Sequence, residues 1–327
     1  MSSNGFWGKL PKPFFALAPM ADVTDAAFRR IITKYGKPDV MWTEFVSVEG
    51  LCSPGREVLL RDFMFTDEER PIVAQIFGST PEKFFKVALL IRELGFDGID
   101  INMGCPDRNV EKQGGGASMM KNPSLAQEVI AATIEGGKGL PVSVKTRVGY
   151  NKVELDTWLP KLLEMKLAAV TIHARTRKEM SLVPANWDHV ARAVEIARGT
   201  GTLIIGNGDV KNLDDARIKA EATGADGIML GRAIFGNPRL FSPGEKLSRL
   251  SLDNREQVAE KLRVMIEHTK LFVELLGDIK NFAIMKKHYK AYVNGFDGAK
   301  ELRVALMEAE SVEQIETLVQ NWLTVHS

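Results

Sequence analysis

The sequence predicts an α/β protein built as a (β/α)8 TIM barrel followed by a small helical domain at its C-terminal end. Short apolar runs alternate with segments of helical spacing eight times between residues 14 and 231, as expected for a closed barrel. The strand pattern stops after Pro243, and from Asn254 onward apolar residues recur at helical spacing only. We therefore expect a barrel domain over residues 1–241, a linker over 242–251 and a helical domain over 252–327.

Each predicted strand is a short apolar run that ends in a polar or glycine-containing turn. Runs of this kind, bounded by turn residues, are typical of strands buried on both faces of a parallel sheet. They cover residues 14–20, 40–45, 72–77, 99–103, 142–146, 169–174, 203–206 and 227–231.

Helical segments separate these strands, and several carry their own start and stop signals. After the first strand, Thr24 or Asp25 is placed to cap a helix within residues 22–34. Residues 81–95 begin with proline, end with glycine and carry apolar residues on one face. Further helical segments cover residues 122–137 and 213–223.

An open, doubly wound sheet is the alternative arrangement of the same units. Dinucleotide-binding sheets of that type carry a Gly-x-Gly-x-x-Gly turn after the first strand, and this chain has no such turn there. We therefore prefer the barrel.

Composition limits the classes of protein to which the chain can belong. The hydrophobic content of 45% is sufficient for a full core, yet no apolar run reaches twenty residues and no charged-then-apolar leader precedes the first strand. We expect no membrane span and no secretory signal. Cys52 and Cys105 are the only cysteines, which excludes a disulfide scaffold, argues against a metal site and fits a reducing cytoplasm. The net charge of +1 gives no global signal for nucleic-acid binding.

The fourth predicted strand ends abruptly in Gly104, Cys105 and Pro106. We expect Gly104 to adopt backbone angles closed to other residues, while Pro106 restricts Cys105 toward extended conformations. A thiol is therefore presented at a strand end, and the polar, glycine-rich segment 107–117 follows it as a possible cover. The alternative is that Cys105 only packs as a small apolar residue.

Every predicted strand ends in a residue that can hydrogen-bond, carry charge or let a ligand approach the backbone. In a barrel these ends meet at one rim, where catalytic groups gather. The residues at this rim are Pro19, Met20, Ala21, Thr43, Glu44, Gln75, Asn102, Cys105, Lys145, His173, Asn207, Gly208, Asp209, Gly231 and Arg232.

The types of these residues indicate a flavin. Glycines 208 and 231 with Arg232 follow the last two strands, where barrels commonly bind a phosphate. Lys145 is buried by its position and needs an anionic or carbonyl-rich partner, which a reduced flavin ring supplies. Gln75 could contact the pyrimidine edge of the ring, and residues 19–21 could lie against its face. The alternatives are a salt bridge from Lys145 to Asp100 or Glu44, and a purely structural hydrogen bond for His173.

Several motifs together resemble the tRNA-dihydrouridine synthases. The resemblance extends from about residue 14 to residue 240 and continues more weakly through residues 285–288. One departure is Asp22, where many members have glycine. The motifs are Ala-Pro-Met-Ala-Asp-Val-Thr-Asp, Thr-Glu-Phe-Val-Ser, Asn-Met-Gly-Cys-Pro, Gly-Gly-Gly-Ala, Val-Lys-Thr-Arg, His-Ala-Arg-Thr-Arg, Gly-Asn-Gly-Asp and Leu-Gly-Arg-Ala.

The resemblance implies an FMN-bound barrel that reduces the C5=C6 bond of selected uridines in tRNA, with NADPH as the reductant. It implies Cys105 as the general acid that protonates C5, a role that a mostly protonated thiol can fill at neutral pH. Cys52 lacks a strand-end position and is expected to be structural. We expect a cytoplasmic monomer with no membrane attachment and no protein partner. The implied FMN contacts are Pro19, Met20, Ala21, Gln75, Lys145, His173, Asn207, Gly208, Asp209, Gly231 and Arg232.

The expected contacts to tRNA come from three places in the chain. Asn102 would contact the base or sugar, since a uridine must be turned out of the folded RNA to reach the flavin. The other candidates are basic residues, which in isolation are more often a solvated surface. They are Arg175, Arg177 and Lys178 after the sixth strand and Lys286, Lys287, His288 and Lys290 in the helical domain.

Two functions of other classes stay open at this point. One is an FMN barrel oxidoreductase that acts on a free small metabolite and turns over without RNA. The other is a catalytically silent tRNA-binding protein, which would be colourless or would not need its cysteine. A flavin spectrum separates the silent protein from both enzymes.

Overall fold

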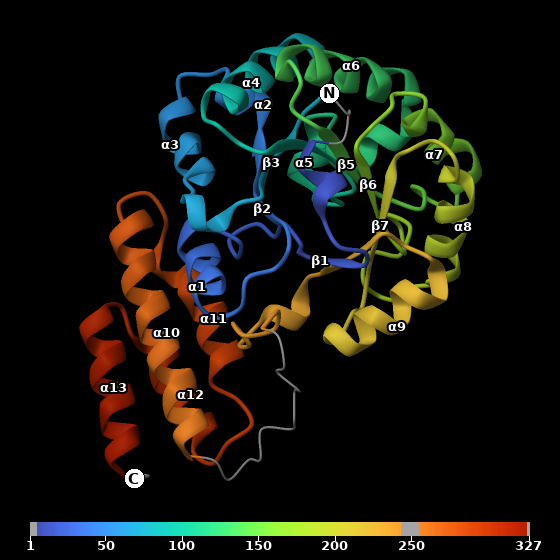
Figure 1. The fold of residues 1–327 in the computed structure, drawn as a ribbon. Helices are drawn as coiled ribbons and strands as arrows, with labels where there is room; N and C mark the ends of the chain where they lie inside the picture. Colours follow the sequence, from blue (N-terminus) through green and yellow to red (C-terminus); the bar gives the residue numbers. More distant parts are fainter. Residues whose placement is uncertain (1–4, 243–254, 326–327) are drawn as a thin grey trace. The chain divides into compact units, whose positions relative to one another are not determined.

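The computed structural model describes residues 5–242 and 255–325 (Figure 1). The predicted linker, residues 242–251, lies outside the described residues except for Ser242. The chain forms two compact units, which are described separately below. One contains the chain up to Val23 and Pro38–Arg232, and the other contains Thr24–Lys37 and the chain from Ala233 onward.

Eight parallel strands form the first unit, in the order β1-β8-β7-β6-β5-β4-β3-β2. A parallel bridge between Ala16 and Val40, with a hydrogen bond of 3.2 Å from Leu17 N to Val40 O, closes the ring between β1 and the chain entering β2. The predicted barrel is therefore confirmed. The strands are β1 (Phe14–Leu17), β2 (Met41–Ser47), β3 (Ile72–Phe77), β4 (Gly98–Met103), β5 (Val142–Arg147), β6 (Ala169–His173), β7 (Leu203–Asn207) and β8 (Gly227–Leu230).

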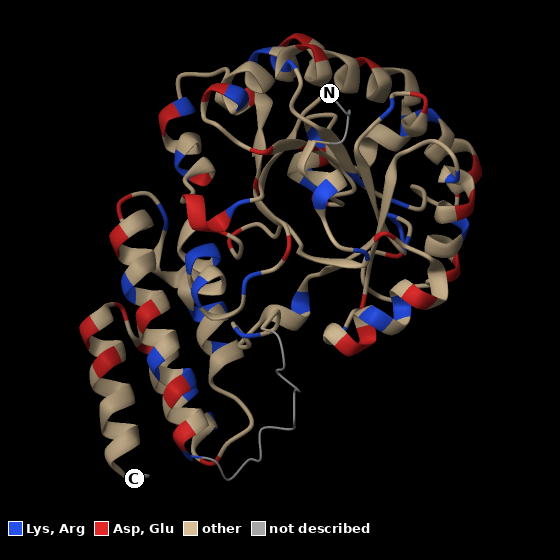
Figure 2. Ribbon diagram, viewed as in Figure 1, with Lys and Arg blue, Asp and Glu red and all other residues tan. Residues whose placement is uncertain are grey.

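Helices cover the outside of these strands (Figure 1). Local sequence explains where several of them begin and end: the Asn122 side chain caps α6 by accepting from Leu125 N, and Gly224 ends α9 in the left-handed conformation. Lys and Arg are interspersed with Asp and Glu along these helices (Figure 2), in keeping with the small net charge. The helices are α2 (Val48–Leu51), α3 (Arg56–Leu60), α4 (Pro81–Glu93), α5 (Arg108–Lys112), α6 (Pro123–Gly137), α7 (Leu155–Leu163), α8 (Asp188–Ala197) and α9 (Leu213–Thr223).

The barrel interior is apolar at the N-terminal ends of its strands. Trp7 from the short 3-10 helix Gly5–Lys9 packs there with Phe14 and Trp42, and Val73 and Leu203 belong to the same cluster. Apolar side chains fill this end, so polar side chains that face inward gather toward the C-terminal ends.

The second unit is helical. It consists of α1 (Ala26–Gly36), α10 (Arg255–Leu276), α11 (Met285–Tyr292), α12 (Ala299–Glu308) and α13 (Val312–Val325). The predicted barrel domain, residues 1–241, includes α1, whereas the packing of α1 groups it with the C-terminal helices. Lys34 and Tyr35 at its end both bond to Glu267 of α10, each at 2.6 Å. No helix among the described residues is long and apolar enough to cross a membrane.

Candidate active site at the C-terminal ends of the strands

Hydrogen bonds hold the backbone of the turn that carries Cys105. Asn102 Oδ1 accepts from Gly104 N at 3.1 Å and from Cys105 N at 2.9 Å. The carbonyl of Gly104 accepts from Arg147 Nε at 2.8 Å, and the carbonyl of Cys105 accepts from Ala117 N at 2.9 Å. The thiol is therefore carried by a rigid turn at the end of β4, as the sequence predicts.

The reason for glycine at position 104 differs from our expectation. Gly104 is not among the residues with a left-handed φ. A Cβ atom there would lie 3.2 Å from Cα and from the carbonyl carbon of Thr146 on β5. Glycine is needed because the turn approaches the neighbouring strand closely, and not because of unusual backbone angles.

The surroundings of Cys105 favour the protonated thiol. Burial raises the pKa of the Cys105 thiol above its ordinary value, while the backbone N–H of Asp107 and the cations Lys145 and Arg147 act in the opposite direction. The net shift of the pKa is upward, so the sulfur carries a proton at neutral pH. Cys52, at the end of α2, is exposed.

A chain of buried side chains connects this turn to the interior of the barrel. Asn102 Nδ2 donates to Gln75 Oε1 at 3.1 Å, and Gln75 Nε2 donates to Asp100 Oδ2 at 2.6 Å. Ser143 Oγ donates to Asp100 Oδ1 at 2.5 Å. Asp100 is fully buried, and this burial raises its pKa to about 6. The hydrogen bonds from Ser143 and Gln75 lower the pKa but do not outweigh burial.

Sequence reasoning did not place Asp100 in the site. The alternation along β4 could have revealed it: Ile99, Ile101 and Met103 belong to the apolar cluster of the barrel, while Asp100 and Asn102 point to the opposite face. Two polar residues on the inward face of a buried strand need partners.

The structure also changes the expected role of Asn102. This residue is only 6% exposed, and its side-chain oxygen already accepts hydrogen bonds from two backbone N–H groups. Its clearest role is to hold the Cys105 turn.

Lys145 lies on β5 beside Asn102 in the strand register. Burial and the nearby Arg147 lower its pKa to about 8, while Asp100 acts against this shift. Among the described residues, Lys145 forms no hydrogen bond and no salt bridge, so the alternative of an ion pair with Asp100 or Glu44 is not found. A buried ammonium group without an anion is suited to a ligand that carries or develops negative charge.

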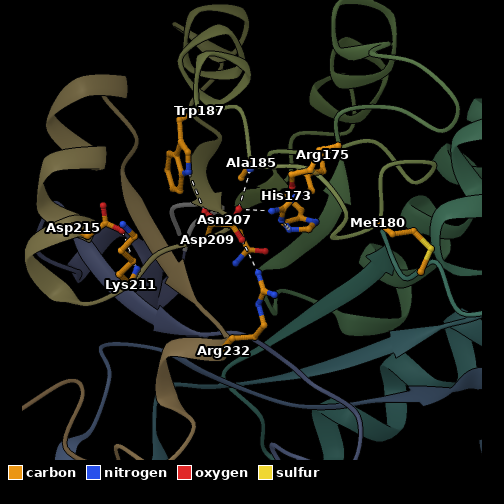
Figure 3. Close-up of polar contacts among 12 residues, drawn as sticks. His173, Arg175, Met180, Ala185, Trp187, Asn207, Asp209, Lys211, Asp215 and Arg232 are labelled. Carbon is orange, nitrogen blue, oxygen red and sulfur yellow. Dashed lines mark hydrogen bonds and ion pairs between the residues drawn. The ribbon is translucent and has the colours of Figure 1, made fainter.

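Asp209 connects the loops that follow β6, β7 and β8 (Figure 3). Its carboxylate pairs with Arg175 and, at 2.6 Å, with Arg232, and it also accepts from Ala185 N at 3.0 Å. Burial alone would raise the pKa of Asp209. The hydrogen bond from Ala185 N and the charges of Arg175 and Arg232 outweigh burial and keep this pKa below its ordinary value. Arg232 is 66% exposed and so remains open to a further anion.

Arg175 is an internal support of the site, in contrast to its predicted role in RNA binding. Its side chain is 3% exposed. Besides Asp209 it contacts Val183 O at 2.6 Å and lies 3.3 Å from His173 Nε2 (Figure 3). Burial and the surrounding cations, Lys145 first among them, hold the pKa of His173 far below its ordinary value. His173 is therefore neutral and can accept a hydrogen bond or donate one.

Gly231, just after β8, leaves room for a ligand to approach the backbone, whereas a Cβ atom at Gly208 would lie 2.8 Å from Ala185 Cβ. A Cβ atom at Gly231 would lie 3.6 Å from Ala18 Cβ and 3.8 Å from Met20 Sδ, in space beside the first strand end. Gly208 has φ +128°, and its carbonyl accepts from Trp187 Nε1 at 3.0 Å. Asn207 uses its amide within the barrel, donating to Met229 O at 2.8 Å. Open backbone at Gly231 beside an exposed guanidinium fits a phosphate group.

Asp22 takes a conformation that glycine normally occupies. Its φ is +53°, and its backbone N–H donates to the carboxylate of Glu44 on β2. Asp22 therefore keeps a left-handed turn beside Met20, because aspartate tolerates this conformation better than most residues do.

Arg177 and Lys178 differ in their surroundings. Arg177 pairs with Glu111 of α5, with Nε 2.9 Å from Oε1, and lies over the ring of Tyr150 at 5.3 Å. Lys121 lies over the same ring at 3.9 Å. Lys178 is exposed. These contacts link the loops after β4, β5 and β6 around Tyr150, whose carbonyl also accepts from Lys178 N at 2.9 Å.

The basic residues of α11 belong to the helical unit and divide into two groups. Lys287 and Lys290 are exposed and Lys286 is partly exposed. His288 is 1% exposed, 4.6 Å from the ring of His268 and 5.1 Å from that of Phe28. Burial and Lys287 lower its pKa to about 3. We therefore correct the prediction for His288: it is a neutral core residue because the helix turns it inward.

Comparison with known proteins relates the whole chain to one family. Residues 16–325 match the family model described as dihydrouridine synthase. Among solved structures, the old yellow enzyme homologue from Zymomonas mobilis aligns with a TM-score of 0.47 and 14% identity, covering 70% of this chain and 86% of that one.

Curated relatives match at higher identity. The probable tRNA-dihydrouridine synthase of Staphylococcus aureus (strain COL) is 40% identical over 326 residues, covering 98% of this chain and 96% of that protein. The probable tRNA-dihydrouridine synthase 2 of Bacillus subtilis (strain 168) is 40% identical over 327 residues, covering 98% and 97%. Because the family match and these relatives span nearly the whole chain, the protein belongs to the dihydrouridine synthase family of flavin-dependent oxidoreductases.

Proposed function

We propose that this protein reduces the C5=C6 bond of specific uridines in tRNA, with bound FMN as the hydride donor and NADPH as the source of electrons. The observation that carries the proposal is a protonated thiol, Cys105, on a rigid turn beside the buried, unpaired ammonium of Lys145. These two groups stand at one rim of a barrel whose family is that of the dihydrouridine synthases.

The residues at the rim fit FMN in chemistry and in space. Arg232, steadied by Asp209, would bind the phosphate beside the open backbone of Gly231. Lys145 would stand opposite the part of the ring that gains negative charge on reduction. The remaining proposed contacts are Pro19, Met20, Ala21, His173, Asn207 and Gly208. The expected contact from Gln75 is withdrawn, because its side chain is fully buried and its amide bonds to Asp100 and Asn102.

Cys105 would supply the proton. A bound flavin would supply the hydride for C6 of the uracil, and C5 would then need a proton. A thiol whose pKa is raised by burial holds that proton at neutral pH and can deliver it from the fixed turn. The cations Lys145 and Arg147 then stabilise the thiolate that remains, which lowers the cost of the transfer.

Binding of tRNA would use the exposed cations of both units. In the barrel these are the exposed Lys178 and the partly exposed Arg177, which also pairs with Glu111, on the loop after β6. In the helical unit they are Lys286, Lys287 and Lys290 of α11. Contacts to phosphates would offset the cost of turning a uridine out of the folded RNA. We further propose that the protein is a cytoplasmic monomer; its two unpaired cysteines are typical of a reducing compartment.

The decisive experiment maps dihydrouridine in tRNA from cells that lack this protein and from the same cells after its return. We expect specific dihydrouridines to disappear and to reappear. The absorbance spectrum of the purified protein provides the second measurement, with flavin bands expected. Flavin bands without any change in tRNA would favour an oxidoreductase of a free metabolite, and a colourless protein would favour a silent RNA-binding protein.

A further inference from the structure

We infer that Asp100 is a positioning residue that sets the orientation of two buried amides and, through them, the position of the Cys105 thiol. The catalytic part of this inference rests on the proposed function, whereas the structural part does not. The observations are the hydrogen bonds that connect Asp100, Gln75, Asn102 and the Cys105 turn inside the barrel.

The orientation of Asn102 is dictated by the turn. Gly104 N and Cys105 N are both donors, so the atom of Asn102 that faces them must be its oxygen. The amide nitrogen of Asn102 then faces Gln75 and donates to Gln75 Oε1 at 3.1 Å. A reversed Asn102 would place its N–H groups against two backbone N–H groups, which leaves buried donors without acceptors.

The same logic passes from Asn102 to Asp100. Because Gln75 presents its oxygen to Asn102, its Nε2 must find an acceptor on the other side, and it donates to Asp100 Oδ2 at 2.6 Å. An ionised carboxylate only accepts, so it permits one orientation of Gln75 and excludes the other. Ser143 Oγ donates to the second carboxylate oxygen from β5, which holds Asp100 in place.

Burial makes each hydrogen bond in this chain necessary. Asp100 and Gln75 are fully buried and Asn102 is 6% exposed, so water cannot replace a lost partner easily. The chain also crosses three neighbouring strands: Gln75 on β3 is in register with Asp100 on β4, and Asp100 with Ser143 on β5. A change at Asp100 should therefore reach Cys105 through Gln75 and Asn102, without any contact between Asp100 and the thiol.

The test measures the alkylation of Cys105 by iodoacetamide in the full chain. Cys52→Ala leaves Cys105 as the single thiol, and excess FMN keeps the flavin content equal among variants. In this background, Asp100→Leu removes the acceptor. The quantity compared is the rate constant of alkylation at high pH, where the thiol is fully ionised. We expect it to rise about fivefold to tenfold, because losing the free energy of one net hydrogen bond increases the population of the opened turn by about that factor.

Two controls separate positioning from general damage. Asp100→Asn retains an oxygen that can accept from Gln75, and its rate should stay near that of the parent protein. Thr171→Val changes another buried side chain of the barrel, whose hydroxyl has no hydrogen-bond partner within the described chain, and should leave the rate unchanged. An unchanged rate in folded Asp100→Leu, or an equal rise in Asp100→Asn, would overturn the inference.

Two further measurements keep the outcome clear. If Asp100→Leu does not fold, Gln75→Met interrupts the same chain one residue later, with the same expected rise in alkylation. For uridine reduction, we expect Asp100→Leu to lower kcat and to leave KM for tRNA unchanged, since the side chain is buried away from RNA. If the parent protein forms no dihydrouridine, the proposed function fails, while the alkylation rates still decide whether Asp100 positions Cys105.

Discussion

Arg147 Nε donates to the carbonyl oxygen of Gly104 over 2.8 Å, which places a buried guanidinium directly beside the turn that carries Cys105. The NH1 group of Arg147 donates to Thr176 O at 3.0 Å and to Met180 O at 3.1 Å. One cation therefore ties the turn after β4 to the loop after β6. Its charge also favours the thiolate form of Cys105.

Replacement of Arg147 by methionine should move the pKa of Cys105 upward. The reason is that Arg147 is one of two cations that oppose the effect of burial on this thiol. The pKa can be read from the pH dependence of iodoacetamide alkylation in a Cys52→Ala background. Arg192→Met, on an exposed guanidinium of α8, is the control and should leave the pKa unchanged. A downward shift in Arg147→Met would contradict the electrostatic argument.

Cys105→Ala should retain FMN, reduction by NADPH and tRNA binding, but lose uridine reduction by about 10²–10⁴-fold. This is the usual contribution of a general acid. Single-turnover formation of dihydrouridine after mixing the reduced protein with tRNA measures the step itself. Cys52→Ala, on the exposed thiol, should react at the normal rate. Normal turnover in Cys105→Ala would mean that the thiol only packs.

Arg232→Ala should weaken the binding of FMN and leave the fold intact. Arg232 is largely exposed, and Asp209 keeps its pair with Arg175 when Arg232 is removed. The measurement is the FMN content after extensive dialysis, compared with thermal unfolding of the same samples. Arg217→Ala, which removes an exposed guanidinium of α9, is the matched control. Full retention of FMN by Arg232→Ala would move the phosphate site elsewhere.

The raised pKa of Asp100 predicts a pH dependence of stability. Its pKa is about 6 in the folded protein and 3.8 ordinarily, so the folded state binds this proton more tightly. The stabilisation from protonated Asp100 is present below about pH 4 and is lost as the pH rises through 6. The full effect is about 3 kcal/mol.

Asp100→Asn cannot ionise and should not show this loss. Urea unfolding at several values between pH 5 and pH 8 should therefore show the variant gaining stability relative to the parent protein as the pH rises. The difference between the two proteins removes the contribution of other titrating groups. A difference that stays constant over this range would show that Asp100 does not titrate there.

Lys286→Glu combined with Lys287→Glu should weaken tRNA binding and make it less sensitive to salt. Each lost phosphate contact removes counterion release, so the slope of log K against log salt becomes shallower by about one for each contact. Filter binding at several salt concentrations measures both effects. Lys83→Glu with Lys86→Glu on α4 makes the same change of charge on another helix and should have little effect. Equal losses in both variants would indicate a nonspecific effect of charge.

The strand ends were predictable because their signals are local. An apolar run, a glycine or proline and a polar residue are neighbours in the chain, and Cys105, Lys145 and His173 accordingly stand where the sequence places them. The cap of α1 by Asp25 is of the same kind, since its side chain accepts from Phe28 N three residues later. Such features depend on backbone preferences and short spacings alone.

The partners of the polar side chains could not be predicted in the same way. Arg175 and His288 sit in basic segments that suggest RNA binding, yet one pairs with Asp209 and the other packs against His268. Asn102 turns back on its own loop. A charged or polar residue has the same local signature whether it faces solvent or the interior, because burial is decided by segments far away in the chain.

By itself, the sequence determined the eight β/α units, the position of the thiol at a strand end and the rim on which the site is built, since hydrophobic periodicity and turn residues specify these elements locally. Only the tertiary structure decided that α1 packs with the C-terminal helices, that Gly104 is required by the approach of β5, and that Gln75 joins Asp100 to Asn102. These relationships join residues separated by tens to hundreds of positions. Close packing and hydrogen bonding across strands create them, and neither leaves a pattern within a short stretch of chain.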